Sequence, residues 1–162
     1  MIHRKLMTLL FCSVGLGFAQ TSLPVMQATI SLDMALEAAQ VALASCEAEG
    51  YRVSVTVVDA SGNEKVLLKS DGAGPHTRAS SFGKAFTSAS MRSATADIAA
   101  NTADNAQLDE LKSMDERILI LAGGLPIMLA GDVIGGIGVG GAPGGNLDAA
   151  CAQAGLDAVL GN

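Results

Sequence analysis

Residues 134–141 are Ile-Gly-Gly-Ile-Gly-Val-Gly-Gly, and Gly136 to Gly141 within them match the pattern G-x-G-x-x-G. That pattern alone suggests a dinucleotide site, but such a site also requires a following helix and a second parallel strand that ends in an acid. Fewer than 25 residues follow Gly141, which is enough for one helix and no further strand. We therefore reject a dinucleotide site. We interpret residues 133–139 as a strand whose glycines let a helix, a subunit or a flat ligand approach its backbone.

Other apolar runs predict the strands that accompany this one. Residues 118–121 and 126–129 precede it, and only short glycine-containing loops separate the three segments. Loops this short connect antiparallel neighbours and leave no room for crossover helices. Earlier in the chain, residues 52–58 and 64–69 are β-rich and flank a type I turn pattern, so we expect a hairpin there. The sequence thus predicts five antiparallel strands.

Helices are expected on either side of these strands. Ser31 and Gly50 bound an apolar repeat with helical spacing, which predicts a helix over residues 32–49. The polar residues 102–116 suggest a surface turn or a helical piece. The other predicted helices are one capped by Thr77, one over residues 95–101 and one over residues 147–160. The element order predicts an α+β fold in which helices flank a five-stranded antiparallel sheet.

The N-terminus is typical of a secretory signal peptide. Arg4 and Lys5 precede a short apolar run, and Gly17 and Ala19 are small residues at the two positions that signal peptidase recognises. The run is too short for a membrane-spanning helix, which needs about 20 apolar residues. We expect residues 1–19 to be a cleaved signal peptide and residues 20–162 to form a single domain that is periplasmic or secreted.

Charge and composition restrict the partners of this domain. The whole chain has a formal net charge of −6, and the signal peptide removes positive charge only. So acidic a domain argues against nucleic-acid binding, and no later segment is long and apolar enough to be transmembrane. The chain is 49% hydrophobic but 3% aromatic, so many small apolar side chains need cover. We expect a homo-oligomer that packs through the glycine strand and the alanine-rich final helix.

Two chemical questions stay open at this stage. Cys46 and Cys151 remain after removal of the signal peptide, and they either form a disulfide in an oxidising compartment or stay as buried thiols. No G-x-S-x-G motif and no zinc-spaced pair of Cys or His occurs, and His76 is the one histidine of residues 20–162. The sequence therefore does not indicate a conventional enzyme, and it leaves catalytic activity undecided.

The segment from Asp71 to Lys84 carries the richest polar cluster. A glycine loop leads to a helix N-terminus, where anions are favoured and where cationic side chains add charge-assisted hydrogen bonds. Phe82 and Phe86 lie in the same predicted helix and offer an apolar face. The candidate binding residues are His76, Thr77, Arg78, Phe82, Lys84, Phe86 and Thr87. The alternative is a capped helix whose phenylalanines only fill the core.

Six segments, in this order, resemble the GlcG/HbpS family of haem-binding proteins, whose domain also occurs at the C-terminus of PduO-type adenosyltransferases. Together they cover nearly the whole of the chain after the signal peptide, and the ordered set is specific. The segments are residues 57–62 (VVDASG), 71–77 (DGAGPHT), 84–87 (KAFT), 123–127 (GGLPI), 134–145 (IGGIGVGGAPGG) and 147–155 (LDAACAQAG).

This resemblance implies both a fold and a function. The fold is a profilin-like or PAS-like α-β-α arrangement, in agreement with the element order, and the family forms homo-oligomers. Some relatives bind haem outside the membrane and report redox or iron stress to a membrane sensor, whereas others accompany glycolate or diol metabolism. We therefore expect an exported, oligomeric haem-binding protein for haem or iron sensing or storage. The alternative is an accessory protein or enzyme that acts on a small carboxylate or hydroxy acid.

The resemblance and the polar cluster together suggest how haem is held. The porphyrin would lie on Phe82 and Phe86, with its propionates near Arg78 or Lys84. His76 is the expected metal ligand, because imidazole binds haem iron far more commonly than a hydroxyl does. Some relatives are described with a threonine ligand, and the matching motifs contain Thr77 and Thr87. The sequence does not choose between these two threonines.

Overall fold

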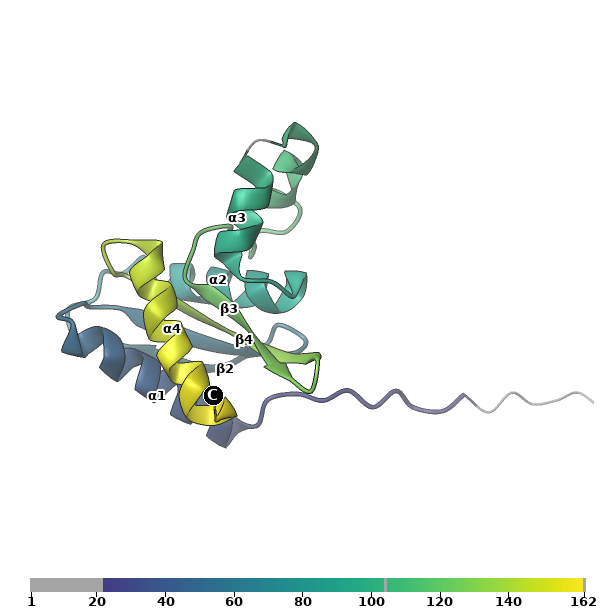
Figure 1. Cartoon of the computed structure of the whole chain (residues 1–162), viewed down its shortest axis with the longest axis horizontal. Helices are drawn as coiled ribbons and strands as arrows, with labels where there is room; N and C mark the ends of the chain where they lie inside the picture. The colour runs from purple at the N-terminus through teal and green to yellow at the C-terminus, as the bar shows by residue number, and fades with distance from the viewer. Residues whose placement is uncertain (1–21, 104, 162) are drawn as a thin grey trace, which may run out of the picture.

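Helices and two β-hairpins follow one another along the chain (Figure 1). The computed structural model describes residues 22–103 and 105–161, so the expected signal peptide, residues 1–19, lies outside the described residues. The elements are α1 (Leu32–Ala48), β1 (Ser54–Asp59), β2 (Glu64–Lys69), α2 (Thr77–Met91), α3 (Thr95–Ala103), the 3-10 helix η1 (Ala106–Lys112), β3 (Gly124–Leu129), β4 (Asp132–Gly140) and α4 (Gly145–Leu160).

Helices cover both faces of the sheet. α1 packs on α4, and this pair lies on one face, whereas α2 lies on the other face against β1, β4 and β3. In Figure 1, α1 and α4 run in front of the sheet and α2 lies behind it. The larger apolar core is formed between the sheet and the α1–α4 pair, and the strands contribute Val55, Val57, Ile137 and Val139 to it. The expected α-β-α layering is confirmed.

The sheet has the strand order β2-β1-β4-β3, and each neighbouring pair is antiparallel. Among the described residues it contains four strands, so the predicted fifth strand at residues 118–121 is wrong. That segment lies against α2, where the Leu119 N–H donates to Thr87 Oγ1 over 2.8 Å. The Leu121 N–H turns back to the Leu119 carbonyl oxygen at 3.0 Å. Because these donors are committed to a helix side chain and a local turn, the segment cannot extend the strand ladder.

The N-termini of α1 and α2 are capped differently. At α1 the expected cap is confirmed, since Ser31 Oγ accepts from the Met34 N–H at 3.2 Å. At α2 the prediction that Thr77 caps the helix is wrong, because the N-cap residue is His76 and Thr77 is the first helical residue. Thr77 Oγ1 instead donates to the Gly74 carbonyl oxygen at 2.7 Å and so ties the preceding loop to the helix.

Glycines of β4 bring α2 onto the sheet at backbone distance. A Cβ on Gly138 would lie 2.2 Å from the Ser81 carbonyl oxygen, and one on Gly136 would lie 2.4 Å from that of Ala85. Any side chain at these two positions would push the helix away. The sequence left open whether a helix, a subunit or a flat ligand approaches the glycine-rich strand. In the structure, a helix takes that place.

The α1–α4 contact depends on small residues in the same way. A Cβ on Gly155 would lie 2.3 Å from the Ala38 carbonyl oxygen, and Cys46 of α1 forms a disulfide with Cys151 of α4. The question of cysteine pairing is thereby answered. The glycine strand is an internal surface, so the expectation that it mediates association is wrong. The outer face of α4, which carries Ala150 and Ala158, is exposed, and its role in association stays a prediction.

A segment after α2 projects from the body of the domain (Figure 1). It comprises α3, η1 and the chain up to β3, and none of the residues 105–122 is buried. Several of these residues are aliphatic, and Met114 and Leu121 are more than half exposed. In the part of the chain that the structure describes, no helix combines the length and the apolar character required to cross a membrane.

Candidate functional site

A groove runs along the outer side of α2, where the segment of residues 116–121 forms its second wall. We call it the α2 groove. It has a volume of about 610 Å³ and is lined by His76, Ala79, Ser80, Phe82, Gly83, Glu116, Arg117, Ile118, Leu119 and Leu121. A second hollow of about 340 Å³ adjoins it and shares Ala79 and Phe82, with Glu64 and Arg78 as its other lining residues. Both hollows therefore depend on the first two turns of α2.

Gly83 and Thr87 fix the second wall of the groove against α2. A Cβ on Gly83 would lie 2.8 Å from Leu119 Cβ, so only glycine lets the wall come this close. One turn further along the helix, Thr87 accepts the hydrogen bond from the Leu119 N–H. The wall is thus held by one steric contact and one hydrogen bond, and its aliphatic side chains are left to face the groove.

His76 lies at the N-terminal end of the groove. It is exposed, and its side chain makes no capping hydrogen bond to α2. The imidazole folds back over the preceding loop, since a Cβ on Gly74 would lie 2.7 Å from His76 Cε1. The imidazole therefore lies beside the groove without being used as a cap, and a neutral imidazole is a good metal ligand.

The two threonines of the family motifs are buried, and both hydroxyls have partners. Ser54 Oγ lies 2.7 Å from Thr77 Oγ1, and Thr77 donates its proton to Gly74. Thr87 accepts from Leu119. A similar pair, Thr56 and Ser81, joins β1 and α2 at 2.8 Å. The Ser54–Thr77 and Thr56–Ser81 pairs satisfy each other between sheet and helix, and Thr87 is satisfied by the Leu119 backbone, as is normal for buried polar groups.

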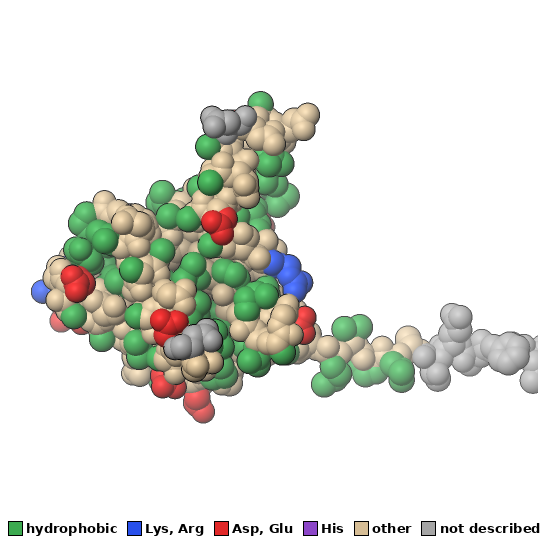
Figure 2. Space-filling view, in the orientation of Figure 1, with side chains coloured by type: hydrophobic (Ala, Val, Ile, Leu, Met, Phe, Trp, Pro, Cys, Tyr) green, Lys and Arg blue, Asp and Glu red, His purple; other side chains and the backbone are tan. Residues whose placement is uncertain are grey.

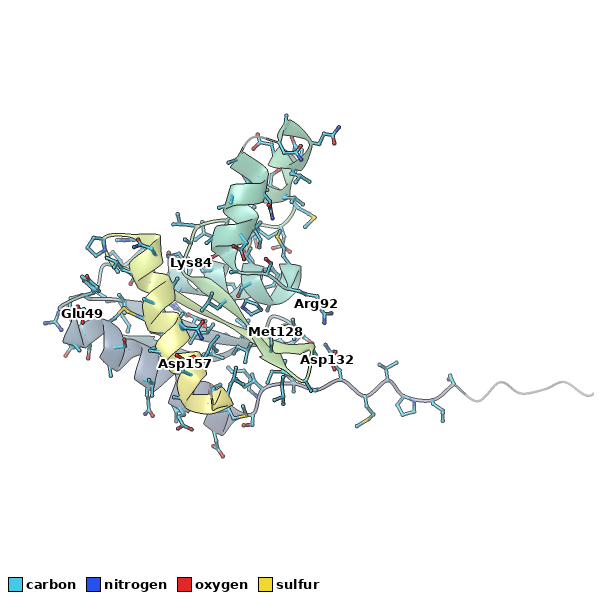
Figure 3. The ribbon with its side chains drawn as sticks, in the orientation of Figure 1. Glu49, Lys84, Arg92, Met128, Asp132 and Asp157 are labelled. Carbon is cyan, nitrogen blue, oxygen red and sulfur yellow. A yellow bond between two sulfur atoms is a disulfide. The ribbon has the colours of Figure 1, made fainter. Side chains whose placement is uncertain are left out.

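Lys84 is also buried and has two partners. Its ammonium lies 2.6 Å from Asp148 Oδ2 and donates to the Val139 carbonyl oxygen at 2.9 Å. Figure 3 shows Lys84 beside the N-terminal end of α4, where Asp148 lies. The ammonium therefore points through the edge of the sheet toward α4 and away from the α2 groove.

The two phenylalanines of α2 have different environments. Phe82 is half-buried and lines both hollows, whereas Phe86 is 7% exposed. Their rings are stacked, with centroids 6.1 Å apart and planes inclined by 26°. Phe82 is thus the aromatic surface that a ligand could reach, and Phe86 supports it from below.

Arg117 is a groove residue that the sequence did not single out. Its guanidinium pairs with Asp115, with Nε–Oδ1 and Nη2–Oδ2 distances of 2.9 and 2.7 Å, and Cζ lies 4.1 Å from the centroid of the Phe86 ring. The side-chain hydrogen bond from Arg117 lowers the pKa of Asp115 to about 2, and the same bond raises the pKa of Arg117. Both groups therefore stay ionised at neutral pH.

The structure thus divides the residues predicted from the sequence into two sets. His76 and Phe82 line the α2 groove, and Arg78 lines the adjoining hollow. Thr77, Lys84, Phe86 and Thr87 of the same helix are buried and do not line the α2 groove. No group of three or more His, Cys, Asp or Glu residues in the described ranges could hold a metal ion. His76 is the imidazole that lines the α2 groove.

Comparison with known proteins identifies the family. The family model described as haem degrading protein HbpS-like matches residues 30–157. A crystal structure of a double mutant of HbpS from Streptomyces reticuli has a TM-score of 0.81 and 39% identity, covering 93% of this chain and 99% of that one. A crystal structure of a PduOC–heme complex has a TM-score of 0.75 and 25% identity, covering 81% of this chain and 95% of that one.

A curated relative agrees with this result. It is an uncharacterized 15.0 kDa protein of Citrobacter freundii, encoded in the dhaT-dhaS intergenic region, and it is 36% identical over 115 residues, or 70% of this chain and 81% of the relative. The family model spans nearly all of the described domain, and the HbpS structure shares its fold over almost the full length. The resemblance in the ordered motifs is therefore confirmed, and the chain belongs to the HbpS-like family.

Proposed function

We propose that this protein binds haem in the α2 groove and that His76 is the axial ligand of the iron. The observation that carries the proposal is the place of His76, whose exposed imidazole borders the same groove as Phe82. Two properties of its relatives support haem as the bound molecule. The family model is described as haem degrading, and a similar PduOC domain was crystallised with heme.

The residues of the groove fit a porphyrin. A volume of about 610 Å³ lies within the roughly 300–1,000 Å³ of typical ligand sites, which are mainly apolar with a few placed polar groups. Phe82, Ile118, Leu119 and Leu121 supply apolar walls, and the cation of Arg117 lies on the rim. An imidazole, a flat aromatic neighbour and a cation together match the iron, the ring and the propionates of haem.

Each of these groups would have a distinct role. Bound haem would supply an iron centre for redox chemistry or for binding small ligands. His76 would hold the iron, whereas Phe82 and Leu119 would pack on the ring and exclude water from its faces. Thr87 and Gly83 would act indirectly, because they fix the wall that carries Leu119.

Haemin titration tests the proposal directly. Adding haemin to the purified protein at micromolar concentration should give a saturable Soret shift. Absence of saturation would overturn haem binding. A parallel thermal-shift series with glycolate, lactate and related acids tests the alternative, and stabilisation by these acids without a Soret shift would favour carboxylate binding in its place.

We further propose that the protein is exported and works as a homo-oligomer. The Cys46–Cys151 disulfide supports export, because structural disulfides persist in oxidising compartments. Exposed apolar side chains support association. Figure 2 shows them on the projecting segment and on the extended N-terminal segment, and they include Leu23, Val25, Met26, Met114 and Leu121. Surfaces of this kind are commonly covered by a partner.

Export and association can both be measured on the expressed protein. Expression of the full sequence in a bacterium should give a periplasmic protein whose N-terminus is Gln20. Light scattering at micromolar concentration should give a mass that is a multiple of the protomer. A cytoplasmic product with intact Met1 would contradict export. A monomer at about 50 μM would contradict association, which depends on protomer concentration.

A further inference from the structure

Arg117 separates two hollows of the surface. It lines the α2 groove on one side. On the other side it lines a smaller hollow of about 150 Å³, together with Phe86, Ser90 and the turn at Ala60, Ser61 and Gly62. The side chain is about half exposed, so its guanidinium is accessible to a molecule that occupies the groove.

Two contacts fix the plane of this guanidinium. Asp115 holds one edge through the Nε and Nη2 hydrogen bonds, and its Oδ1 also accepts from the backbone N–H of Arg117 at 2.9 Å. The Phe86 ring lies beneath the face at 4.1 Å. Phe86 is itself held in place, because a Cβ on Gly62 would lie 2.7 Å from its ring. The cation is therefore oriented in advance of ligand binding.

The pairing with Asp115 leaves most of the donors of Arg117 unused. A guanidinium has five N–H donors, and the Asp115 side chain takes two of them, one on Nε and one on Nη2. The remaining three, on Nη1 and Nη2, suit a planar carboxylate, for which two parallel N–H···O bonds are the usual arrangement. We propose that Arg117 binds a carboxylate of the ligand that occupies the α2 groove, with Asp115 as the residue that positions it.

This inference rests on the proposed function, in which the carboxylate is a haem propionate. The other two cations considered are less suitable. Lys84 is buried against Asp148, and Arg78 lines the adjoining hollow, where Glu64 faces the same space. Within the lining of the α2 groove itself, Glu116 is the opposing charge next to Arg117. Glu116→Gln should therefore strengthen the binding of a carboxylate.

A comparison of two porphyrins tests this assignment. Haemin carries two propionates, whereas its dimethyl ester has the same ring and iron without the carboxylates. Arg117→Gln should weaken haemin binding about tenfold or more, the size expected for loss of a charge-assisted hydrogen-bonded pair, and should leave the affinity for the ester within about twofold. Arg117→Lys keeps the charge but loses the paired N–H donors of the guanidinium, so its haemin affinity should fall between those of the wild-type protein and Arg117→Gln.

Control variants separate positioning from binding. Asp115→Asn keeps the Arg117 charge but weakens its orientation, so haemin affinity should fall less than in Arg117→Gln, and ester affinity should not change. Arg52→Gln removes an exposed cation outside the groove and should change neither affinity.

The possible outcomes distinguish this inference from the proposed function. If the wild-type protein binds haemin and the ester equally well, or if Arg117→Gln weakens both to the same extent, the assignment of Arg117 is overturned and haem binding stands. If the wild-type protein binds neither porphyrin saturably, haem binding fails and the assignment fails with it. Selective loss of haemin affinity in Arg117→Gln supports both.

Discussion

Lys84 Nζ and Asp148 Oδ2 lie 2.6 Å apart, with side chains only 2% and 4% exposed, and they connect the two helical layers of the domain. Lys84 belongs to α2 and Asp148 to the first turn of α4, on opposite faces of the sheet. Gly123 leaves room for the Lys84 side chain to reach α4, since a Cβ at Gly123 would lie 2.9 Å from Lys84 Nζ. Asp148 Oδ1 also accepts from the Ala142 N–H at 3.0 Å. The pair therefore joins the groove helix to the end of β4 and to α4.

Breaking this pair should cost much stability. Lys84→Met leaves a buried carboxylate without its counter-ion, and we expect a loss of about 3–5 kcal/mol in the free energy of unfolding. The double variant Lys84→Met/Asp148→Leu removes both charges and should lose much less than the sum of the two single variants. Urea denaturation followed by circular dichroism measures these values.

Lys112 provides the matched control for Lys84. It pairs with Asp109 on the surface, where the side chains are 56% and 64% exposed, so Lys112→Met should change stability by less than about 1 kcal/mol. Equal effects of Lys84→Met and Lys112→Met would mean that the buried pair does not connect the layers.

The disulfide should stabilise the α1–α4 pair. Cys46 and Cys151 are separated by 105 residues, and closing a loop of this length is expected to contribute about 2–5 kcal/mol. The double variant Cys46→Ala/Cys151→Ala should unfold at a correspondingly lower urea concentration, and reduction of the wild-type protein should have a similar effect. Titration of free thiols under denaturing conditions gives the control, and detection of two reactive thiols in the unreduced domain would contradict the pairing.

Gly138 should be the most sensitive glycine of β4. An added methyl group would lie 2.2 Å from the Ser81 backbone oxygen, so Gly138→Ala must displace α2 and should cost more than about 2 kcal/mol. Gly131→Ala is the comparison, because Gly131 has φ +89° but open space around it. This change involves backbone strain alone, of about 1–2 kcal/mol. If Gly131→Ala proves the more damaging in thermal denaturation, close helix–sheet packing is not what the glycine strand provides.

Much of the fold could be predicted from local patterns. Alternation, turn residues and caps predicted α1, the β1–β2 hairpin, β3, β4 and α4, and the lengths of the loops predicted antiparallel pairing. Residues 118–121 were misassigned because a short apolar run looks the same whether it pairs with a strand or packs on a helix. Its contact with Thr87, 32 residues earlier in the chain, decides the matter, and no local pattern contains that contact.

The candidate site was predicted less completely, for a similar reason. The sequence identified α2, but it could not distinguish the face of α2 toward the sheet from the face toward solvent. Because the glycines of β4 admit the helix so closely, polar residues such as Thr77, Ser81 and Lys84 become buried. Arg117 was missed because it follows a polar segment that was interpreted as surface. The spacing of Asp115 and Arg117 was the available signal, since an aspartate can bond a backbone N–H two residues ahead.

The last prediction distinguishes His76 from the two threonines as the iron ligand. His76 is exposed beside the groove, whereas the hydroxyls of Thr77 and Thr87 are committed to Gly74 and Leu119. His76→Ala should therefore shift the Soret band of the haem complex and speed the release of haem.

Variants of the threonines should affect folding and leave the iron unchanged. Thr77→Val and Thr87→Val each leave a buried hydrogen-bonding group without its partner, so each should lower stability by about 1–3 kcal/mol, while the spectrum of the bound haem stays as in the wild-type protein. His76→Ala should show the reverse, with a changed spectrum and almost unchanged stability, because its exposed side chain makes no capping hydrogen bond. A wild-type haem spectrum that only Thr77→Val or Thr87→Val alters would assign the ligand to that threonine. The hydroxyl would then have to leave its present partner, which requires α2 or the wall carrying Leu119 to move when haem binds.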